Sequence, residues 1–191
     1  EYQKAIDADP NYAEAHNGLG NALLKQNKID QAIGHYRKAL AVKPDYAEAH
    51  LNLGNTMFAQ AKLDEAMAEY RQALDVKPGY AEAYNNLGLA LANRGQVEEA
   101  LAHYQKALEI QPGYTDARYN LAVILYQQVR IPEAITELRK LLDVQPEHTP
   151  ALNKLAWVLA TSPVKSTRNA TEAVELAQRA AKLTDHRDAG S

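Results

Sequence analysis

Apolar residues recur along the chain at the spacing of amphipathic helices, in pairs of stripes separated by short polar breaks. The first complete pair lies within residues 13–46, where the polar break falls at residues 26–28. The apolar positions of that pair are Leu19, Leu23, Ala32, Ile33, Tyr36, Ala39 and Leu40. A period near 3.6 residues predicts a helix, and a short connection predicts antiparallel neighbours. Each pair of stripes therefore predicts a helical hairpin.

The hairpin pattern repeats with a fixed period that prolines make visible. Prolines stand 34 residues apart at Pro10, Pro44, Pro78, Pro112 and Pro146. Proline lacks a donor N–H and disfavours helical geometry in the residue before it, so each is expected to end the second helix of a unit. Self-similarity at a fixed period is typical of solenoid architectures. We therefore divide the chain into gapless repeats at residues 13–46, 47–80, 81–114 and 115–148.

The two ends of the chain depart from this unit. Residues 1–12 match only the last third of a unit, which predicts the second helix of a truncated repeat. A fifth unit is expected at residues 149–184, with a lengthened loop between its helices at residues 161–172. No proline follows to start another unit, so we expect the array to close there, before a polar tail at residues 185–191.

Small and large residues recur at fixed places in these units and carry a resemblance to a known family. In the first complete unit these residues are Leu19, Gly20, Ala32, Tyr36, Ala39 and Pro44, and the next two units repeat them. The chain thus resembles the tetratricopeptide repeat family, and its repeats are similar to the repeat arm of O-linked N-acetylglucosamine transferase. The resemblance implies an all-α fold: a right-handed superhelical α-solenoid of stacked antiparallel helix-turn-helix hairpins.

The same resemblance places the first helix of each unit on the concave side of the solenoid. On those helices the second, fifth, sixth, ninth, twelfth and thirteenth residues of a unit fall within an arc of about 120° opposite the packing face. We expect this arc to form a peptide-binding groove. Its candidate residues are Asn17, Asn21, Lys25, Asn52, Asn55, Asn85, Asn86, Tyr119, Asn120, Tyr126 and Trp157.

Asparagine dominates the early part of this arc. A carboxamide both donates and accepts hydrogen bonds, so an asparagine ladder of Asn52, Asn86 and Asn120 can pair with an extended backbone. Hydrogen bonds alone offset the cost of association poorly, so aromatic anchors late in the arc are needed as well. Two alternatives stay open. In the first, the asparagines tie hairpins together or face water instead of binding a peptide. In the second, Trp157 packs beneath the loop at residues 161–172 instead of lining the groove.

Charge and composition narrow the class of ligand. Lysine and arginine total 21 against 24 acids, for a net charge of −3, which gives no overall field to attract nucleic acid. The second residues of four units form an acidic row, Glu14, Glu48, Glu82 and Asp116, which favours a neutral or basic peptide. No apolar run approaches the roughly 18 residues of a membrane-spanning helix, so we expect no membrane insertion.

Catalytic and metal-binding patterns are not found in the sequence. The chain has no cysteine, and histidines at equivalent positions stand whole units apart, too far to share a metal ion. We therefore expect no enzyme activity, no cofactor and no metal. The leading prediction is a non-catalytic scaffold that binds a protein or peptide segment in its concave groove.

Two further functions fit the sequence. The first is the substrate-recruiting arm of a larger enzyme such as a glycosyltransferase, an alternative that sequence upstream of Glu1 would decide. The second is a self-assembling scaffold. The helix of residues 1–12 is expected to leave an apolar stripe of Tyr2, Ala5 and Ile6 uncovered, which favours head-to-tail self-association.

Overall fold

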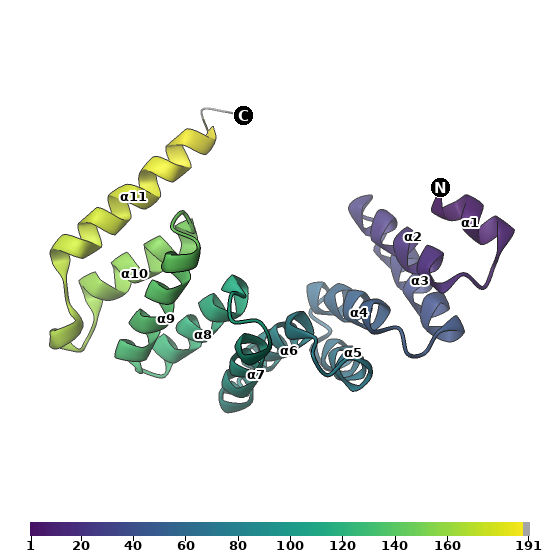
Figure 1. Cartoon of the computed structure of the whole chain (residues 1–191), viewed down its shortest axis with the longest axis horizontal. Helices are drawn as coiled ribbons and strands as arrows, with labels where there is room; N and C mark the ends of the chain where they lie inside the picture. Colours follow the sequence, from purple (N-terminus) through teal and green to yellow (C-terminus); the bar gives the residue numbers. More distant parts are fainter. Residues whose placement is uncertain (189–191) are drawn as a thin grey trace. The chain divides into compact units, whose positions relative to one another are not determined.

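The computed structural model describes residues 1–188, and every regular element in that part of the chain is helical (Figure 1). The chain forms two compact units, one of residues 1–103 and one from Tyr104 onward, and their boundary falls inside α7 (Val97–Ile110). The first unit holds α1 (Tyr2–Ala8), α2 (Ala13–Lys25), α3 (Ile29–Val42), α4 (Ala47–Ala59), α5 (Leu63–Val76) and α6 (Ala81–Asn93). The second holds α8 (Thr115–Gln127), α9 (Ile131–Val144), α10 (Thr149–Thr161), the short 3₁₀ helix η1 (Lys165–Thr167) and α11 (Ala170–Asp188).

A residue in the left-handed backbone conformation ends the first helix of a hairpin. At the end of α2, Asn27 has a φ of 59°, and the amide of Lys28 donates to the carbonyl of Leu23 at 2.9 Å. This bond is that of a Schellman motif, which satisfies carbonyl groups at the end of a helix. The equivalent residues of later turns, Ala61, Gly95 and Val129, also have positive φ. The turn between α2 and α3 occupies only residues 26–28, as the polar break predicts.

Glycine and tyrosine bring the two helices of a hairpin into close contact. A Cβ added to Gly20 would lie 2.5 Å from the Tyr36 ring, and one added to Gly54 would lie 2.7 Å from the Tyr70 ring. Both tyrosine side chains are buried, and burial raises the pKa of Tyr36 to about 12. The tyrosines thus fill space that only a residue without a side chain leaves open.

The fourth and twenty-third residues of a unit meet across the hairpin, and we call this pair the hairpin clasp. In the first complete unit His16 Nδ1 lies 3.0 Å from His35 Nδ1, and His16 Nε2 lies 3.1 Å from the carbonyl oxygen of Pro10. The next unit pairs His50 Nδ1 with Glu69 Oε2 at 2.7 Å. The clasp therefore joins the two helices of a hairpin. The fourth residue of the unit also contacts the carbonyl oxygen of the proline that precedes the hairpin.

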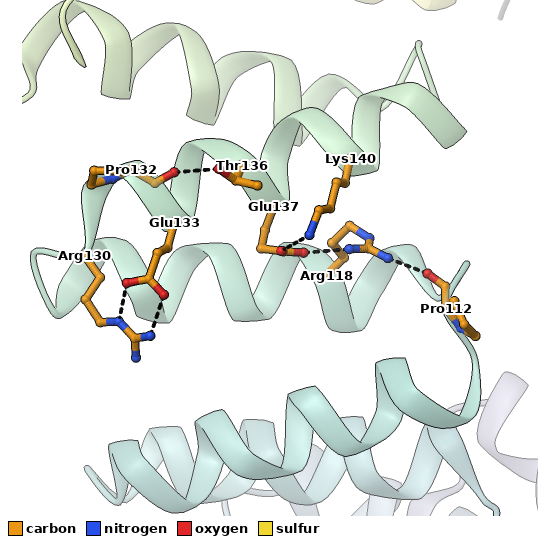
Figure 2. Close-up of polar contacts among 8 residues, drawn as sticks. All are labelled: Pro112, Arg118, Arg130, Pro132, Glu133, Thr136, Glu137 and Lys140. Carbon is orange, nitrogen blue, oxygen red and sulfur yellow. Dashed lines mark hydrogen bonds and ion pairs between the residues drawn. The ribbon is translucent and has the colours of Figure 1, made fainter. Parts of the chain in front are cut away.

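The clasp between α8 and α9 is ionic. Arg118 on α8 donates to Glu137 on α9 at 2.6 Å and to the carbonyl of Pro112 at 2.5 Å (Figure 2). Glu137 also accepts from Lys140, one turn further along α9, at 2.8 Å. The side chains of Arg118 and Glu137 are each only 14% exposed. Loss of Arg118 would therefore leave Glu137 with Lys140 alone, and loss of Glu137 would leave the largely buried Arg118 without a carboxylate.

The last hairpin differs from its prediction. The sequence predicts a loop at residues 161–172, but α10 runs to Thr161 and α11 begins at Ala170. The loop is shorter because Asn169 caps α11: its Oδ1 accepts from the backbone amide of Glu172 at 3.1 Å. A polar tail was expected at residues 185–191, yet α11 continues to Asp188, as the helix-favouring alanine, leucine and lysine residues near its end allow. Residues 189–191 lie outside the described part.

None of the helices described is long and apolar enough to cross a membrane.

Candidate peptide-binding surface

In the first unit, asparagines of α2, α4 and α6 form hydrogen bonds between neighbouring hairpins. Asn52 Nδ2 donates to Asn17 Oδ1 at 2.9 Å, and Asn86 Nδ2 donates to Asn55 Oδ1 at 2.8 Å. Asn17 Nδ2 also reaches the hydroxyl of Tyr46 at 3.4 Å. These carboxamides link consecutive hairpins, which is one of the roles that the sequence left open for them.

Burial separates the candidate asparagines into two groups. Asn17 and Asn85 are only 8% and 5% exposed, so they do not line an open groove as the sequence predicts. Asn17 lies near the edge of the arc, where Tyr46 and Asn52 of the next hairpin contact it. Asn52 and Asn86, at the sixth position, are half-buried, and so is Asn120 on α8 in the second unit.

The bonds of the remaining asparagines decide what they can offer a ligand. Asn21 and Asn55 accept from the hydroxyls of Tyr36 and Tyr70 at 2.7 and 2.9 Å, so these oxygens are engaged within the protein. Asn52 uses its nitrogen for the bond to the preceding hairpin, and no partner of its Oδ1 is found among the described residues. Asn52 is thus held in place through its nitrogen, and its Oδ1 remains able to accept a hydrogen bond from a ligand.

Lysines neutralise part of the predicted acidic row. Lys43 Nζ lies 3.0 Å from Glu14, and Lys77 Nζ lies 3.5 Å from Glu48. The hydrogen bond from Lys43 holds the pKa of Glu14 below its usual value. Lys25, the cation expected in the arc, is exposed in the last turn of α2. The preference for a basic peptide that the row suggests is therefore weakened.

In the second unit, Tyr126 on α8 and Lys154 and Trp157 on α10 come together, and we call them the aromatic–lysine cluster. The rings of Tyr126 and Trp157 meet edge to face with their centroids 5.1 Å apart. Lys154 Nζ stands 4.5 Å from the Tyr126 centroid and 5.0 Å from the Trp157 centroid. Trp157 is 49% exposed, so it does not pack beneath the loop after α10. Tyr119 packs instead against the ring of His148, with centroids 5.7 Å apart.

Lys154 is absent from the site residues predicted from the sequence. The available signal was its spacing of three residues from Trp157, which places both side chains on one face of a helix. Asparagine occupies the sixth position in three of the five units, whereas Lys154 occupies it in the fifth.

An apolar hollow adjoins the aromatic–lysine cluster between α10 and α11. It has a volume of about 450 Å³ and is lined mainly by alanines of both helices, together with Trp157 and Val174. In the first unit the corresponding groove between α2 and α3 is filled by α4, whose Ala49 packs with Ala13 and Ala39. No helix of the described residues fills the groove between α10 and α11.

The histidines do not gather into a metal centre in the described part of the chain. His16 and His35 come within hydrogen-bond distance across a hairpin, a contact that comparing equivalent positions in different units could not find. No group of three or more histidine, aspartate or glutamate side chains there is placed to hold a metal ion.

Sequence models of repeat families match most of the chain. Models described as TPR repeat match residues 20–61 and 54–95, and models described as tetratricopeptide repeat match residues 1–34 and 91–158. A search of curated protein sequences finds no significant match. The likeness to the repeat arm of the transferase stays a prediction.

Solved structures of similar fold agree with this assignment. YrrB, a TPR protein with an unusual peptide-binding site, is 24% identical with a TM-score of 0.73, over 95% of this chain and 91% of that one. A crystal structure of MamA is 23% identical with a TM-score of 0.75, over 88% and 96%. MamA from Desulfovibrio magneticus RS-1 is 16% identical with a TM-score of 0.77, over 92% and 97%. The fold is an α-solenoid, and the chain belongs to the tetratricopeptide repeat family.

Proposed function

We propose that the protein is a non-catalytic scaffold that binds an extended segment of a partner protein along the first helices of its hairpins. The proposal rests chiefly on Asn52, a half-buried carboxamide that is fixed through its nitrogen and keeps an acceptor oxygen. Family membership supports it, because tetratricopeptide repeats typically serve as interaction modules and stacked repeats present extended binding surfaces. YrrB, which shares the fold, has a peptide-binding site.

A carboxamide that is already ordered favours the binding of a peptide backbone. A mobile side chain that becomes fixed on binding costs about 0.5–1.5 kcal/mol. The net gain from one hydrogen bond is of the same size, about 0.5–1.5 kcal/mol, so this cost can cancel the contact. The bond to Asn17 orders Asn52 in the free protein and removes the cost. Asn52 therefore contributes to affinity where a free asparagine would contribute little.

Two alanine variants break the same hydrogen bond and differ in what they remove from the surface. Asn52→Ala removes the bond and the acceptor, whereas Asn17→Ala removes the bond through a side chain that is only 8% exposed. Both should lose about 0.5–1.5 kcal/mol of stability. We expect peptides selected from a diverse library on the wild type to bind both variants several-fold more weakly than the wild type in calorimetry, because Asn17→Ala leaves Asn52 unordered and Asn52→Ala removes its acceptor. Circular dichroism should show equal helicity.

Wild-type affinity in Asn52→Ala would remove Asn52 from the binding surface, and wild-type affinity in Asn17→Ala alone would show that the bond to Asn17 does not matter for binding. The asparagine ladder as a whole is tested by the combined alanine variant of Asn52, Asn86 and Asn120, which should lose more affinity than Asn52→Ala alone. Selection of no peptide by the wild type would contradict the scaffold function itself.

Two other functions stay predictions. A role as the substrate-recruiting arm of a larger enzyme has no observation of its own in this structure. Head-to-tail self-association through α1 draws on Tyr2, which is 49% exposed although its ring lies over Gly18. The same helix has no buried residue, but Ala5 and Ile6 are half-buried, so the apolar stripe expected to be uncovered is only partly open to a partner.

A further inference from the structure

Lys154 holds its charge in a setting that lacks a negative partner. Its ammonium group stands over the rings of Tyr126 and Trp157. No carboxylate of the described residues lies within 4.0 Å of its nitrogen. Burial lowers the pKa of Lys154, because the surrounding groups exclude water without supplying an opposite charge. An anion brought to this place would therefore meet a cation that has already lost part of its hydration.

The acids of α8 and α10 do not change this. Helix α10 carries no acidic residue. On α8, Asp116 lies in the first turn and Tyr126 in the last, and a rise of about 1.5 Å per residue separates them by about 15 Å. That separation exceeds the Debye length of about 8 Å at physiological ionic strength. The positive charge of Lys154 thus has no partner on α8 or α10 and remains available to a ligand.

Trp157 connects this cation to the apolar hollow. Its indole meets Tyr126 and also lines the hollow between α10 and α11. Trp157 is 49% exposed and Val174 is 56% exposed, so large apolar side chains of the hollow are open to a ligand. The volume of about 450 Å³ falls within the range of about 300–1,000 Å³ that is typical of ligand pockets. A large apolar side chain therefore has room to enter.

We propose that the aromatic–lysine cluster and the adjoining hollow bind an acidic peptide segment. A large apolar side chain of the segment enters the hollow against Trp157, and the carboxylate of the next residue pairs with Lys154. The proposal rests on the scaffold function proposed above and names the chemistry of its partner.

Charge complementarity selects this occupant over others. A basic segment would place a second cation beside Lys154, and an apolar segment would cover the lysine without pairing its charge, which is costly. A second copy of this chain, docking through its own α1, is the competing occupant that the experiment below separates.

The test uses capped peptides of equal length in which a phenylalanine is followed by aspartate, asparagine or lysine between the same flanking residues. Emission of Trp157, the single tryptophan of the chain, reports occupation of the site, and anisotropy of labelled peptides gives the affinities. We expect the aspartate peptide to bind roughly tenfold more tightly than the asparagine peptide, as a charge-assisted hydrogen bond provides. The lysine peptide should bind more weakly still.

Variants assign the effect to individual side chains. Lys154→Gln should abolish the difference between the aspartate and asparagine peptides, and Trp157→Ala should weaken the binding of both. Lys182→Gln is the matched control, because it removes the same charge from an exposed position on α11 outside the hollow. This variant should bind all peptides like the wild type, and circular dichroism should show the same helicity for all proteins.

Equal affinity of the wild type for the aspartate and asparagine peptides would overturn the inference, while library peptides that depend on Asn52 would leave the scaffold function standing. If the wild type selects no library peptide at all, both proposals fail together. Sedimentation over a range of concentrations tests the competing occupant. A mass that rises with concentration in the wild type and stays constant in Trp157→Ala would identify a second copy and overturn the acidic-peptide proposal.

Discussion

Val129 stands in a backbone conformation that suits it poorly. Its φ of 59° lies in the left-handed region, where a β-branched side chain crowds the backbone. The equivalent turns use Asn27 and Gly95, residue types that tolerate this region. We expect Val129→Gly to raise the free energy of unfolding by about 1 kcal/mol, because relief of strain exceeds the entropy that an unfolded glycine gains. Val129 is 63% exposed, so little packing is lost, and urea denaturation measures the change.

The reverse exchange, Gly95→Val, supplies the control for this turn. Gly95 has a φ of 78°, and a Cβ added there would meet no atom within 4 Å, so any loss must come from the backbone. We expect Gly95→Val to destabilise the protein in the same assay. A gain in stability from Gly95→Val, or a loss from Val129→Gly, would contradict the assignment of strain to the left-handed residue.

The candidate site could be predicted only in part, for reasons that individual residues make clear. The helical arc correctly brought Tyr126 and Trp157 to one surface, because the spacing on each helix fixes which side chains share a face. It also placed Asn17 with the open residues, since an arc on one helix takes no account of the neighbour that covers its edge. The position of Lys154 over two rings depends on contacts between helices, which the sequence of one helix does not contain.

At the scale of the element, the hairpin clasps of the first two complete repeats respond to pH in opposite directions. Burial, together with the charges of His16 and Lys38, lowers the pKa of His35. Burial also lowers the pKa of His50, but the hydrogen bonds to Glu69 and the Pro44 carbonyl outweigh it and raise the pKa. His35 therefore costs stability as the pH falls below its unfolded value of 6.5. His50 stabilises fully below 6.5, and this contribution is lost as the pH rises through its raised pKa.

Two glutamine variants test separately the pH ranges in which His35 and His50 change the stability. His35→Gln should flatten the loss of stability that the wild type shows on acidification below 6.5, the unfolded value. His50→Gln should flatten the loss that appears as the pH rises above that value. Urea unfolding of both variants and the wild type at a series of pH values measures the slopes. Parallel curves for all three proteins would show that the clasps do not titrate as the contacts indicate.

The elements themselves could be predicted well where apolar spacing and turn chemistry agree. Helices α2 to α5 follow the expected stripes and breaks, because each buries one apolar face and ends at a polar turn or a proline. The sequence predicts the start of α11 too late, because the cap at Asn169 is a single side-chain contact. The sequence predicts the far end of α11 too early, because the polar residues of an exposed helix have the same composition as a polar tail.

At the scale of the whole molecule, the chain is a repeat array, and its stability should be local. In such arrays each repeat is stabilised by itself and by its immediate neighbours, so damage to one hairpin spreads over a short range. Gly20 offers a place to test this, because a Cβ there would lie 2.5 Å from the buried ring of Tyr36. We expect Gly20→Ala to cost about 1–3 kcal/mol through overpacking of the hairpin formed by α2 and α3.

Hydrogen exchange read by mass spectrometry locates the damage. Gly20→Ala should reduce amide protection in α2 and α3 and leave protection in α9 and α10, which belong to the other compact unit, close to that of the wild type. Gly34→Ala is the control: it makes the same exchange within α3 where a Cβ meets no atom within 4 Å, so protection there should rise, as alanine favours the helix over glycine by about 1 kcal/mol. An equal loss of protection in both units from Gly20→Ala would mean that the array unfolds as one cooperative body, because only then does a local clash lower the stability of every helix alike.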